Sequence, residues 1–261
     1  DLVAINPAKT CGECFFCKEK RSNQCSSTRF FGSALLFPHI QGAFREEIVV
    51  SARQCFKLSS TTPEIAAMVE PLSVVLHAIS KVGNLNRQRV LVSGAGPIGL
   101  ITAIVCNFYG AEKIAVTDIE EYPLMIAKKL GVDHIFNMGK DASKLEQYSL
   151  NKENFDLLFE CSGAEEALIP CMKVLKPGSK IVQLGLAAEF NIPIMQLTSK
   201  EFELIGSWRF SEEFGQAVSI LEGGEIDLNP LISHKFSFYE AEKAFLTAAN
   251  RKCAMKVQLC F

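Results

Sequence analysis

Four cysteines, Cys11, Cys14, Cys17 and Cys25, stand within fifteen residues of one another. Thiolates at this density, on a loop that also carries a glycine, can form a tetrahedral sulfur site, and such a site suits zinc. Four thiolates leave no open coordination position, so a zinc held there is structural and takes no part in chemistry. The spacing therefore predicts a structural zinc site.

Three alternatives to zinc are open. Disulfide bonds need an oxidising compartment, and the opening residues lack the basic and then apolar segment of a secretion signal. A Cys-x-x-Cys redox pair would not need Cys17 and Cys25. A bacterial iron–sulfur run has a proline after its last cysteine, whereas Ser26 follows Cys25 here. These observations favour zinc.

A glycine-rich turn lies between the apolar run at residues 89–93 and a helical pattern at residues 97–109. Asp118 ends the next apolar run, 24 residues after Gly94. This order predicts a dinucleotide-binding turn, and a plain glycine turn is the alternative. The residues expected at the cofactor are Gly94, Gly96, Pro97, Ile98, Gly99 and Asp118.

Each of these residue types has a physical reason to be there. Gly94 allows a tight turn, Gly96 lets the backbone approach a pyrophosphate, and Gly99 lets the helix pack on the sheet. The helix that begins at Pro97 offers free N–H groups and a positive dipole end to the phosphates. Asp118 is expected to accept hydrogen bonds from the adenosine ribose.

The same aspartate bears on the choice of cofactor. A carboxylate at Asp118 would repel the 2′-phosphate of NADP. The loop that follows, residues 119–123, adds Glu120 and Glu121 and contains no arginine or lysine. The sequence therefore predicts NAD in preference to NADP.

The elements that must position these residues alternate between strand and helix from about residue 72, which indicates a parallel sheet with helices on both faces. Residues 1–71 read as loop-rich, with strands at the start and at residues 47–50 and with a helix beginning at Thr62-Pro63. The tail is expected to fold back onto this first part. Expected strands are 89–93, 113–118, 134–137, 155–160, 180–184, 203–207 and 256–259, and expected helices are 97–109, 121–130, 164–175, 211–221 and 239–249.

The bulk composition is ordinary for a soluble enzyme. A chain of 261 residues, 48% hydrophobic and 21% charged, is long enough for two domains. Its net charge of -2 gives no reason to expect nucleic acid or an anionic membrane as a partner. No apolar run approaches the roughly 18 residues of a membrane span. Six further cysteines, scattered among apolar neighbours, indicate a reducing cytoplasm.

Together, these motifs resemble the zinc-containing medium-chain alcohol and polyol dehydrogenases, in the sorbitol dehydrogenase branch. The resemblance implies a Rossmann doubly wound parallel sheet at residues 73–208 and a β-rich GroES-like catalytic domain at residues 1–72 and 209–261. The segments that carry it, in the family's order, are the cysteine cluster, Glu70-Pro71-Leu72-Ser73-Val74, the glycine turn, Glu160-Cys161-Ser162-Gly163-Ala164 and Gly206-Ser207-Trp208-Arg209-Phe210.

The resemblance also implies roles for single residues. Glu70 corresponds to a carboxylate at the catalytic zinc, as a ligand or holding its water, and a helix-end carboxylate is the alternative. Arg209 is expected to meet substrate hydroxyls or a carboxylate. The residues expected at the nicotinamide half of the cofactor are Leu184, Gly185, Leu186, Ser207, Trp208 and Arg209.

The implied reaction is oxidation of a secondary alcohol to a ketone by hydride transfer to NAD. The stretch Arg29-Phe30-Phe31-Gly32-Ser33-Ala34, followed by Phe37-Pro38-His39, most resembles members that convert the sugar acid L-idonate to 5-keto-D-gluconate. Arg209, His39 and Arg29 are candidates for binding the carboxylate. Neutral polyols such as sorbitol and xylitol, or a threonine-type substrate, are the alternatives.

The sequence departs from the family pattern at its start. The family's other catalytic-zinc ligands, a Cys and a His-Glu pair, lie upstream of the cysteine cluster, and no matching residues are present here. The chain is therefore expected to be N-terminally incomplete, with a catalytic zinc only in a longer chain; an inactive NAD-binding remnant is a further alternative. A homodimer or homotetramer is expected, with residues 203–207 as a pairing edge.

Overall fold

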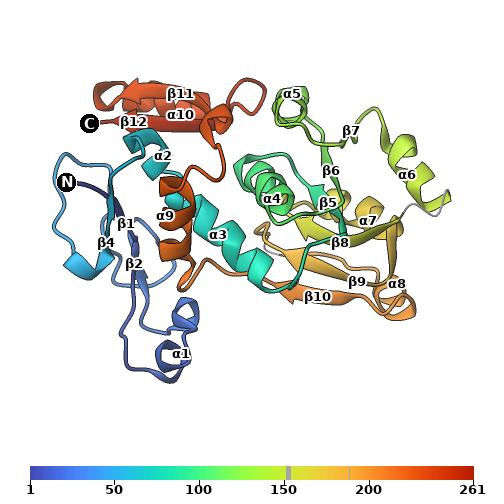
Figure 1. The fold of residues 1–261 in the computed structure, drawn as a ribbon, viewed down its shortest axis with the longest axis horizontal. Helices are drawn as coiled ribbons and strands as arrows, with labels where there is room; N and C mark the ends of the chain where they lie inside the picture. The colour runs from blue at the N-terminus through green and yellow to red at the C-terminus, as the bar shows by residue number, and fades with distance from the viewer. Residues whose placement is uncertain (151–153, 188) are drawn as a thin grey trace.

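The computed structural model describes residues 1–150, 154–187 and 189–261, and its largest element is a six-stranded parallel sheet (Figure 1). The strand order is β10-β9-β8-β5-β6-β7, so β10 lies at one edge. From β5 the chain adds β6 and β7 on one side and then crosses to add β8, β9 and β10 on the other side. Ligands bind in open α/β sheets at the carboxyl ends of the strands where the order changes direction in this way. The strands are β5 (Arg89–Ser93), β6 (Lys113–Asp118), β7 (His134–Asn137), β8 (Phe155–Glu160), β9 (Leu175–Gln183) and β10 (Glu203–Gly206).

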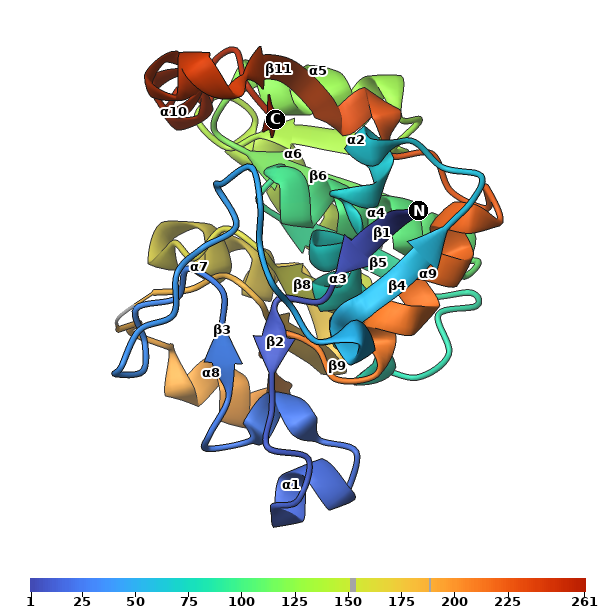
Figure 2. The ribbon, with the colours of Figure 1, turned by 90° about the vertical axis from the view of Figure 1, so that its left-hand side faces the viewer.

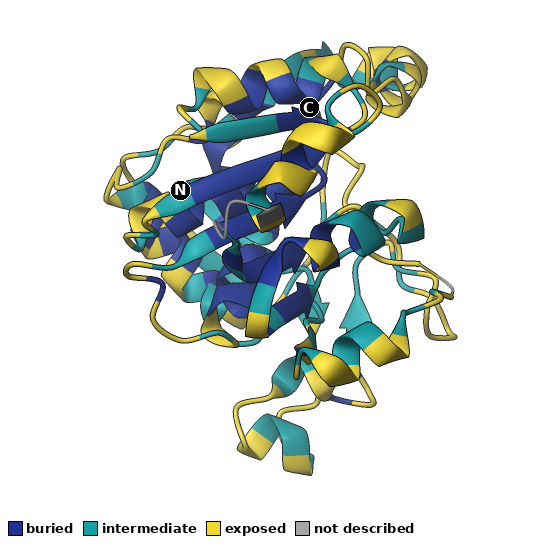
Figure 3. Cartoon of the chain, turned by 90° about the vertical axis from the view of Figure 1, so that its right-hand side faces the viewer, coloured by how far each residue is buried: buried dark blue, intermediate teal, exposed yellow. Residues whose placement is uncertain are grey.

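Both faces of this sheet are covered, because alternate residues of a strand point to opposite sides. In β5, Val90 and Val92 join one buried apolar cluster, whereas Leu91 joins the other. Figure 3 shows the resulting pattern, with largely buried strands in the middle and exposed residues on the helices outside them. The associated helices are α4 (Pro97–Phe108), α5 (Glu121–Lys129), α6 (Ala142–Leu150), α7 (Glu165–Lys173) and α8 (Ile194–Ser199).

The remaining part is built from short pieces, seen face-on in Figure 2. β1 (Leu2–Ile5) pairs antiparallel with β4 (Cys55–Leu58), and β2 (Ala8–Lys9) pairs antiparallel with β3 (Arg29–Phe30). β11 (Ile232–Ser237) pairs parallel with β12 (Lys256–Cys260). The helices are α1 (Phe15–Lys18), α2 (Pro63–Ala66), α3 (Val69–Ser80), α9 (Glu213–Glu222) and α10 (Ala241–Ala249).

The C-terminal segment packs on the first part of the chain, as expected. Helix α9 contacts both α3 and β4. Lys235 Nζ lies 2.9 Å from Glu64 Oε1, and Gln258 Nε2 donates to the Glu64 carbonyl at 2.8 Å. Helix α3 contacts α4 as well as α9, so the expected domain boundary at residues 72/73 falls inside a helix that packs against both parts.

Two sequence expectations about elements have clear outcomes. The helix start at Thr62 is confirmed, because its hydroxyl accepts the Ile65 N–H and Pro63 follows at the first helical position. The strand expected at residues 47–50 is wrong: this segment has no regular structure, and the Val49 side chain is 99% exposed. A run of β-branched residues forms a strand only where a neighbouring strand and a buried face are available.

Within residues 1–150, 154–187 and 189–261, no helix combines the length and the apolar character that crossing a bilayer requires.

Candidate functional site

The four cysteines of the predicted zinc site come together. Their sulfur atoms all lie within 4.8 Å of one another, with Cys11 Sγ 3.9 Å from Cys17 Sγ and 3.5 Å from Cys25 Sγ. A tetrahedral zinc with Zn–S bonds of about 2.3 Å would separate its sulfurs by about 3.8 Å. The donor set therefore fits a zinc ion. Within the described residues, no other group of three or more His, Cys, Asp or Glu side chains could hold a metal in this way.

The segment that carries these cysteines, residues 11–25, is here called the cysteine lobe. Only Cys25 is buried within it, so it has almost no apolar core of its own. Burial alone would raise the pKa of Cys25, but hydrogen bonds from the Cys11 and Ser27 backbone lower it to about 6. The site thus favours a thiolate at Cys25, the form that binds zinc.

Hydrogen bonds join the cysteine lobe to the end of the parallel sheet. Ser22 Oγ lies 2.8 Å from Ser211 Oγ, and Asn23 Nδ2 donates to the Trp208 carbonyl at 2.9 Å. The Asn23 amide also lies 3.2 Å from His77 Nε2, and the other ring nitrogen of His77 contacts Glu213 at 2.8 Å. The lobe therefore holds the Trp208–Arg209 backbone in place.

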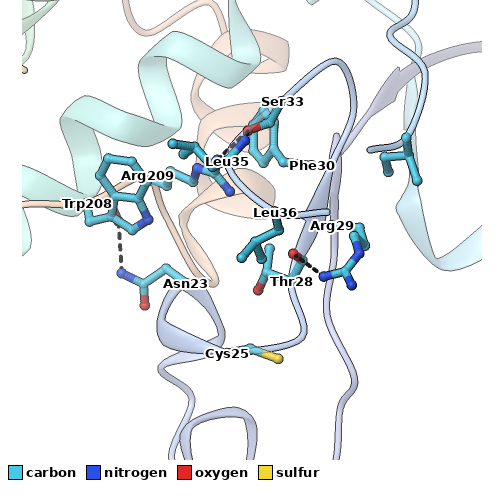
Figure 4. Close-up of a pocket in the computed structure, with 11 residues that line it drawn as sticks. Asn23, Cys25, Thr28, Arg29, Phe30, Ser33, Leu35, Leu36, Trp208 and Arg209 are labelled. Atoms are coloured by element: carbon cyan, nitrogen blue, oxygen red, sulfur yellow. Dashed lines mark hydrogen bonds between the residues drawn. The ribbon is translucent and has the colours of Figure 1, made fainter. Parts of the chain in front are cut away.

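A pocket of about 200 Å³ opens between the cysteine lobe, β3 and this backbone (Figure 4). Arg209 reaches into it, with its guanidinium 4.3 Å from the Phe30 ring centre and 5.0 Å from that of Trp208, and it donates to Ser33 Oγ at 3.2 Å. Arg209 has φ of 50°, a backbone conformation that is uncommon outside glycine and often found at functional sites. The lining residues are Asn23, Cys25, Thr28, Arg29, Phe30, Ser33, Leu35, Leu36, Ile40, Trp208 and Arg209.

Of the three residues that the sequence suggested for binding a substrate carboxylate, two line this pocket and one does not. Arg29 and Arg209 both line the pocket, and Arg29 donates to the Thr28 carbonyl at 3.3 Å. His39 is exposed and is not among the lining residues. A lining that combines two arginines, a serine hydroxyl and apolar side chains is suited to an anionic, hydroxylated molecule.

Glu70 lies in the first turn of α3 and interacts electrostatically with Lys256 and Arg209. Burial raises the pKa of Glu70, and the two cations offset this only partly. Lys256 was not singled out from the sequence, since it lies in a distant strand. Glu70 belongs to no group of three potential metal ligands among the described residues, so these residues do not by themselves form a catalytic zinc site.

The glycine turn between β5 and α4 is closely packed. A methyl group added at Gly99 would lie 1.8 Å from the Gly94 carbonyl oxygen, and Gly94 itself has φ of 91°. Both glycines are therefore needed for the turn and for packing of α4. A methyl group at Gly96 would meet nothing within 4 Å. Gly96 thus leaves open space at the start of α4, where the pyrophosphate of a dinucleotide fits.

Asp118 lies beside this turn at the end of β6, as expected. Its Oδ2 accepts the Ala95 N–H at 2.7 Å, and its Oδ1 accepts the N–H groups of Ile119 and Glu120. Arg251 Nη2, from the turn between α10 and β12, lies 2.6 Å from Asp118 Oδ2. No local sequence pattern could have connected Arg251 with a residue 133 positions earlier.

The loops expected at the nicotinamide half are organised by Glu160, a fully buried carboxylate at the end of β8. It accepts hydrogen bonds from Ser162, Gly163 and Gln183, and its carbonyl accepts the N–H groups of Leu184 and Gly185. Gly185 packs so closely that a methyl group there would lie 2.2 Å from the Gly163 nitrogen. The sequence motif had drawn attention to Glu160 without giving it this role.

Ser207 and Trp208 follow β10 and lie, like Glu160, at the carboxyl ends of the strands. The Ser207 N–H donates to the Gln183 carbonyl at 3.0 Å, which places Ser207 beside the loop that begins at Leu184. The Ser207 hydroxyl is buried and has no hydrogen-bond partner among the described residues. An unpaired hydroxyl at this edge fits a position that a bound cofactor completes.

Comparisons with known proteins agree with this arrangement. Residues 97–223 match the family model described as zinc-binding dehydrogenase, and residues 1–60 match that of the alcohol dehydrogenase GroES-like domain. The chain is 39% identical, over 99% of its length and 76% of the relative's, to L-idonate 5-dehydrogenase (NAD(P)(+)) of Escherichia coli. It is 33% identical to a sorbitol dehydrogenase of Arabidopsis thaliana, over 98% of this chain and 72% of that one.

A solved structure extends the similarity to three dimensions. The crystal structure of L-idonate 5-dehydrogenase from Escherichia coli superposes with a TM-score of 0.94 at 38% identity, covering 99% of this chain and 75% of that one. Almost the whole backbone of this chain thus has the arrangement of a known dehydrogenase. The chain therefore belongs to the zinc-dependent alcohol and polyol dehydrogenases, a family of oxidoreductases.

Proposed function

We propose that this protein oxidises a secondary alcohol of a sugar acid to a ketone with NAD as hydride acceptor, and that L-idonate is the substrate and 5-keto-D-gluconate the product. The observation that carries this proposal is the pocket that Arg209, Arg29 and Ser33 all line. A neutral polyol does not need two guanidinium groups, whereas a carboxylate is bound well by them. The name of the Escherichia coli relative points to the same substrate.

The chain's own residues have distinct tasks in this proposal. Arg209 binds the substrate carboxylate or hydroxyls, and its stacking on Phe30 and Trp208 fixes the plane of the guanidinium. The open space at Gly96 and the start of α4 receive the pyrophosphate, and Asp118 orients the adenosine ribose. NAD held by these residues would supply the acceptor for the hydride.

Two further functions each have an observation in their favour. Similarity to a sorbitol dehydrogenase supports a neutral polyol as substrate, and the threonine-type substrate considered from the sequence belongs in the same comparison. The isolated position of Glu70 among the described ligand types supports an NAD-binding protein without catalysis.

A substrate panel with direct cofactor titration distinguishes these functions. NADH formation is followed with L-idonate, D-gluconate, sorbitol, xylitol and L-threonine, and NADH binding is measured separately by fluorescence. The highest kcat/KM is expected for L-idonate. A higher value for another substrate would overturn the choice of L-idonate, and NADH binding without any turnover would support the non-catalytic function.

A further inference from the structure

The carboxylate of Asp118 has all of its acceptor positions occupied. A carboxylate offers about four lone-pair sites, two on each oxygen. Three are taken by backbone N–H groups, those of Ala95, Ile119 and Glu120, and the fourth by Arg251 at 2.6 Å. A ribose hydroxyl that hydrogen-bonds to Asp118 must therefore replace one of these four donors.

Arg251 is the donor that can give way. The three N–H groups belong to the backbone of the glycine turn and of the loop after β6, which are fixed by the fold. Arg251 instead reaches across from the turn between α10 and β12, and its side chain is 51% exposed while that of Asp118 is 2% exposed. The guanidinium thus touches the ribose-binding carboxylate with one edge and keeps donors free at the surface.

The charge around Asp118 in the structure differs from the charge that the loop sequence alone suggests. Residues 118–123 include the acids Asp118, Glu120 and Glu121 and no arginine or lysine, which predicted repulsion of a 2′-phosphate. In the structure, Arg251 pairs with Asp118, and Lys140 Nζ lies 2.6 Å from Glu121 Oε1. Two of the three acids are therefore matched by cations from other parts of the chain.

We propose that Arg251 is a specificity-determining residue that lets the dinucleotide site accept a 2′-phosphate, so that the protein binds NADP(H) as well as NAD(H). This inference rests on the dinucleotide site of the proposed function. When NAD binds, a ribose hydroxyl takes the place of Arg251 on Asp118. When NADP binds, Arg251 turns its fork of N–H groups to the 2′-phosphate, for which its planar geometry is suited.

Because Arg251 competes with the ribose of one cofactor and binds the phosphate of the other, its removal should act on the two in different ways. NADH and NADPH are titrated separately by fluorescence into the wild-type chain and into Arg251→Ala. The wild-type dissociation constants are expected to lie within about tenfold of each other. In Arg251→Ala, the constant for NADPH should rise at least about tenfold, and that for NADH should stay the same or fall.

Two variants control for charge and shape. Lys252→Ala removes the neighbouring exposed cation, which has no contact with Asp118, and should leave both constants within about twofold of wild type. Arg251→Lys keeps the charge without the planar fork and should give an intermediate constant for NADPH. Thermal unfolding of each variant shows whether the fold is intact.

The outcomes separate this inference from the proposed function. If neither dinucleotide binds to the wild-type chain, the dinucleotide site itself is wrong. If NADH binds but NADPH binds more than about a hundredfold more weakly, or if Arg251→Ala weakens both equally, the role of Arg251 is wrong while the site stands.

Discussion

A single arginine, Arg209, links the pocket beside the cysteine lobe to the segment that follows β10. Its guanidinium is stacked on Phe30 and Trp208 and tied to Ser33 Oγ, so its position is fixed from three sides. Lysine at this position would keep the positive charge but lose the planar fork and the stacking. The orientation of a bound carboxylate would then be lost together with one of its two hydrogen bonds.

We therefore expect Arg209→Lys to lower kcat/KM for L-idonate at least about tenfold and to lower that for sorbitol less. Ser33→Ala, which removes only the group that holds Arg209, should give a smaller loss for L-idonate. Steady-state kinetics of both variants with both substrates provide the measurement. An equal decrease in kcat/KM for L-idonate and for sorbitol would show that Arg209 does not bind the substrate carboxylate.

At the scale of single residues, the sequence predicted groups that belong to a local pattern. The cysteines, the glycines and Asp118 have fixed spacings, and they lie where those spacings require. Arg251 and Lys256 could not be found in this way, because their role depends on a contact made only after the C-terminal segment has folded back. The contact between Arg251 and Asp118 also explains why the net charge around the loop after Asp118 could not be predicted from the sequence of that loop.

Among the elements, the turn between β5 and α4 offers a matched pair of substitutions. Gly99→Ala places a methyl group against the Gly94 carbonyl oxygen at 1.8 Å, where backbone cannot yield without moving α4. It should lower the free energy of unfolding by at least about 2 kcal/mol. Gly96→Ala meets no neighbouring atom, so its stability should match wild type.

The same pair tests the cofactor site, because the methyl group of Gly96→Ala enters the space expected for the pyrophosphate. Its dissociation constant for NADH should rise at least about tenfold with an unchanged melting temperature. Chemical denaturation and NADH titration of both variants supply the data. Normal NADH binding by Gly96→Ala would contradict the placement of the pyrophosphate at this turn.

Helix α9 makes a pH-dependent contact with α3 through Glu213. Burial alone would raise the pKa of Glu213, but hydrogen bonds from His77 and from the Ser211 N–H lower it below its ordinary value of 4.5. A carboxylate with a lowered pKa stabilises the fold above its unfolded-state pKa, and that contribution is lost as the pH falls through the folded-state pKa. Glu213 therefore contributes stability at neutral pH.

We expect Glu213→Gln to be less stable than wild type by about 1 kcal/mol at pH 7, with the difference shrinking once the pH falls below about 4.5. Denaturation curves at a series of pH values test this. Glu212→Gln is the control, because Glu212 is exposed and its contact with Lys20 is 3.7 Å long. A difference that grows toward acid pH would give the opposite sign and refute the assignment.

The sequence predicted the elements of the parallel sheet better than those of the remaining part. Buried strands such as β6 have continuous apolar runs with clear ends, and β6 begins and ends where expected, at Lys113 and Asp118. In the remaining part, strands β2, β3 and β4 were not predicted, because they are at most four residues long and give no strong periodic signal. Short elements of this kind are stabilised by the segments they pack against, and a local sequence pattern does not reveal which segments those are.

For the molecule as a whole, the main question is what stabilises the cysteine lobe. With one buried residue in fifteen, the lobe cannot bury enough apolar surface to offset the entropy of ordering its backbone. We expect the purified chain to contain about one zinc ion per chain by elemental analysis, as four thiolates at these distances require. Cys14→Ser should lose most of this zinc, whereas Cys253→Ser, at an exposed cysteine outside the cluster, should retain it.

Removing the zinc with a chelator should expose residues 11–25 to proteolysis while the parallel sheet stays folded, because the sheet has its own apolar clusters. Limited proteolysis followed by mass spectrometry detects this. Undiminished zinc in Cys14→Ser, or a lobe that resists protease without metal, would contradict the structural zinc.

The chain contains one tryptophan, Trp208, and its surroundings make it an optical probe. Its carbonyl is bound by Asn23 of the cysteine lobe, and the Arg209 guanidinium lies over its ring. Indole emission responds to a nearby cation and to solvent, so one signal reports on two places at once. Loss of zinc from the lobe and arrival of an anion at Arg209 should each shift the emission of this one side chain, and the protein needs no added label for either experiment.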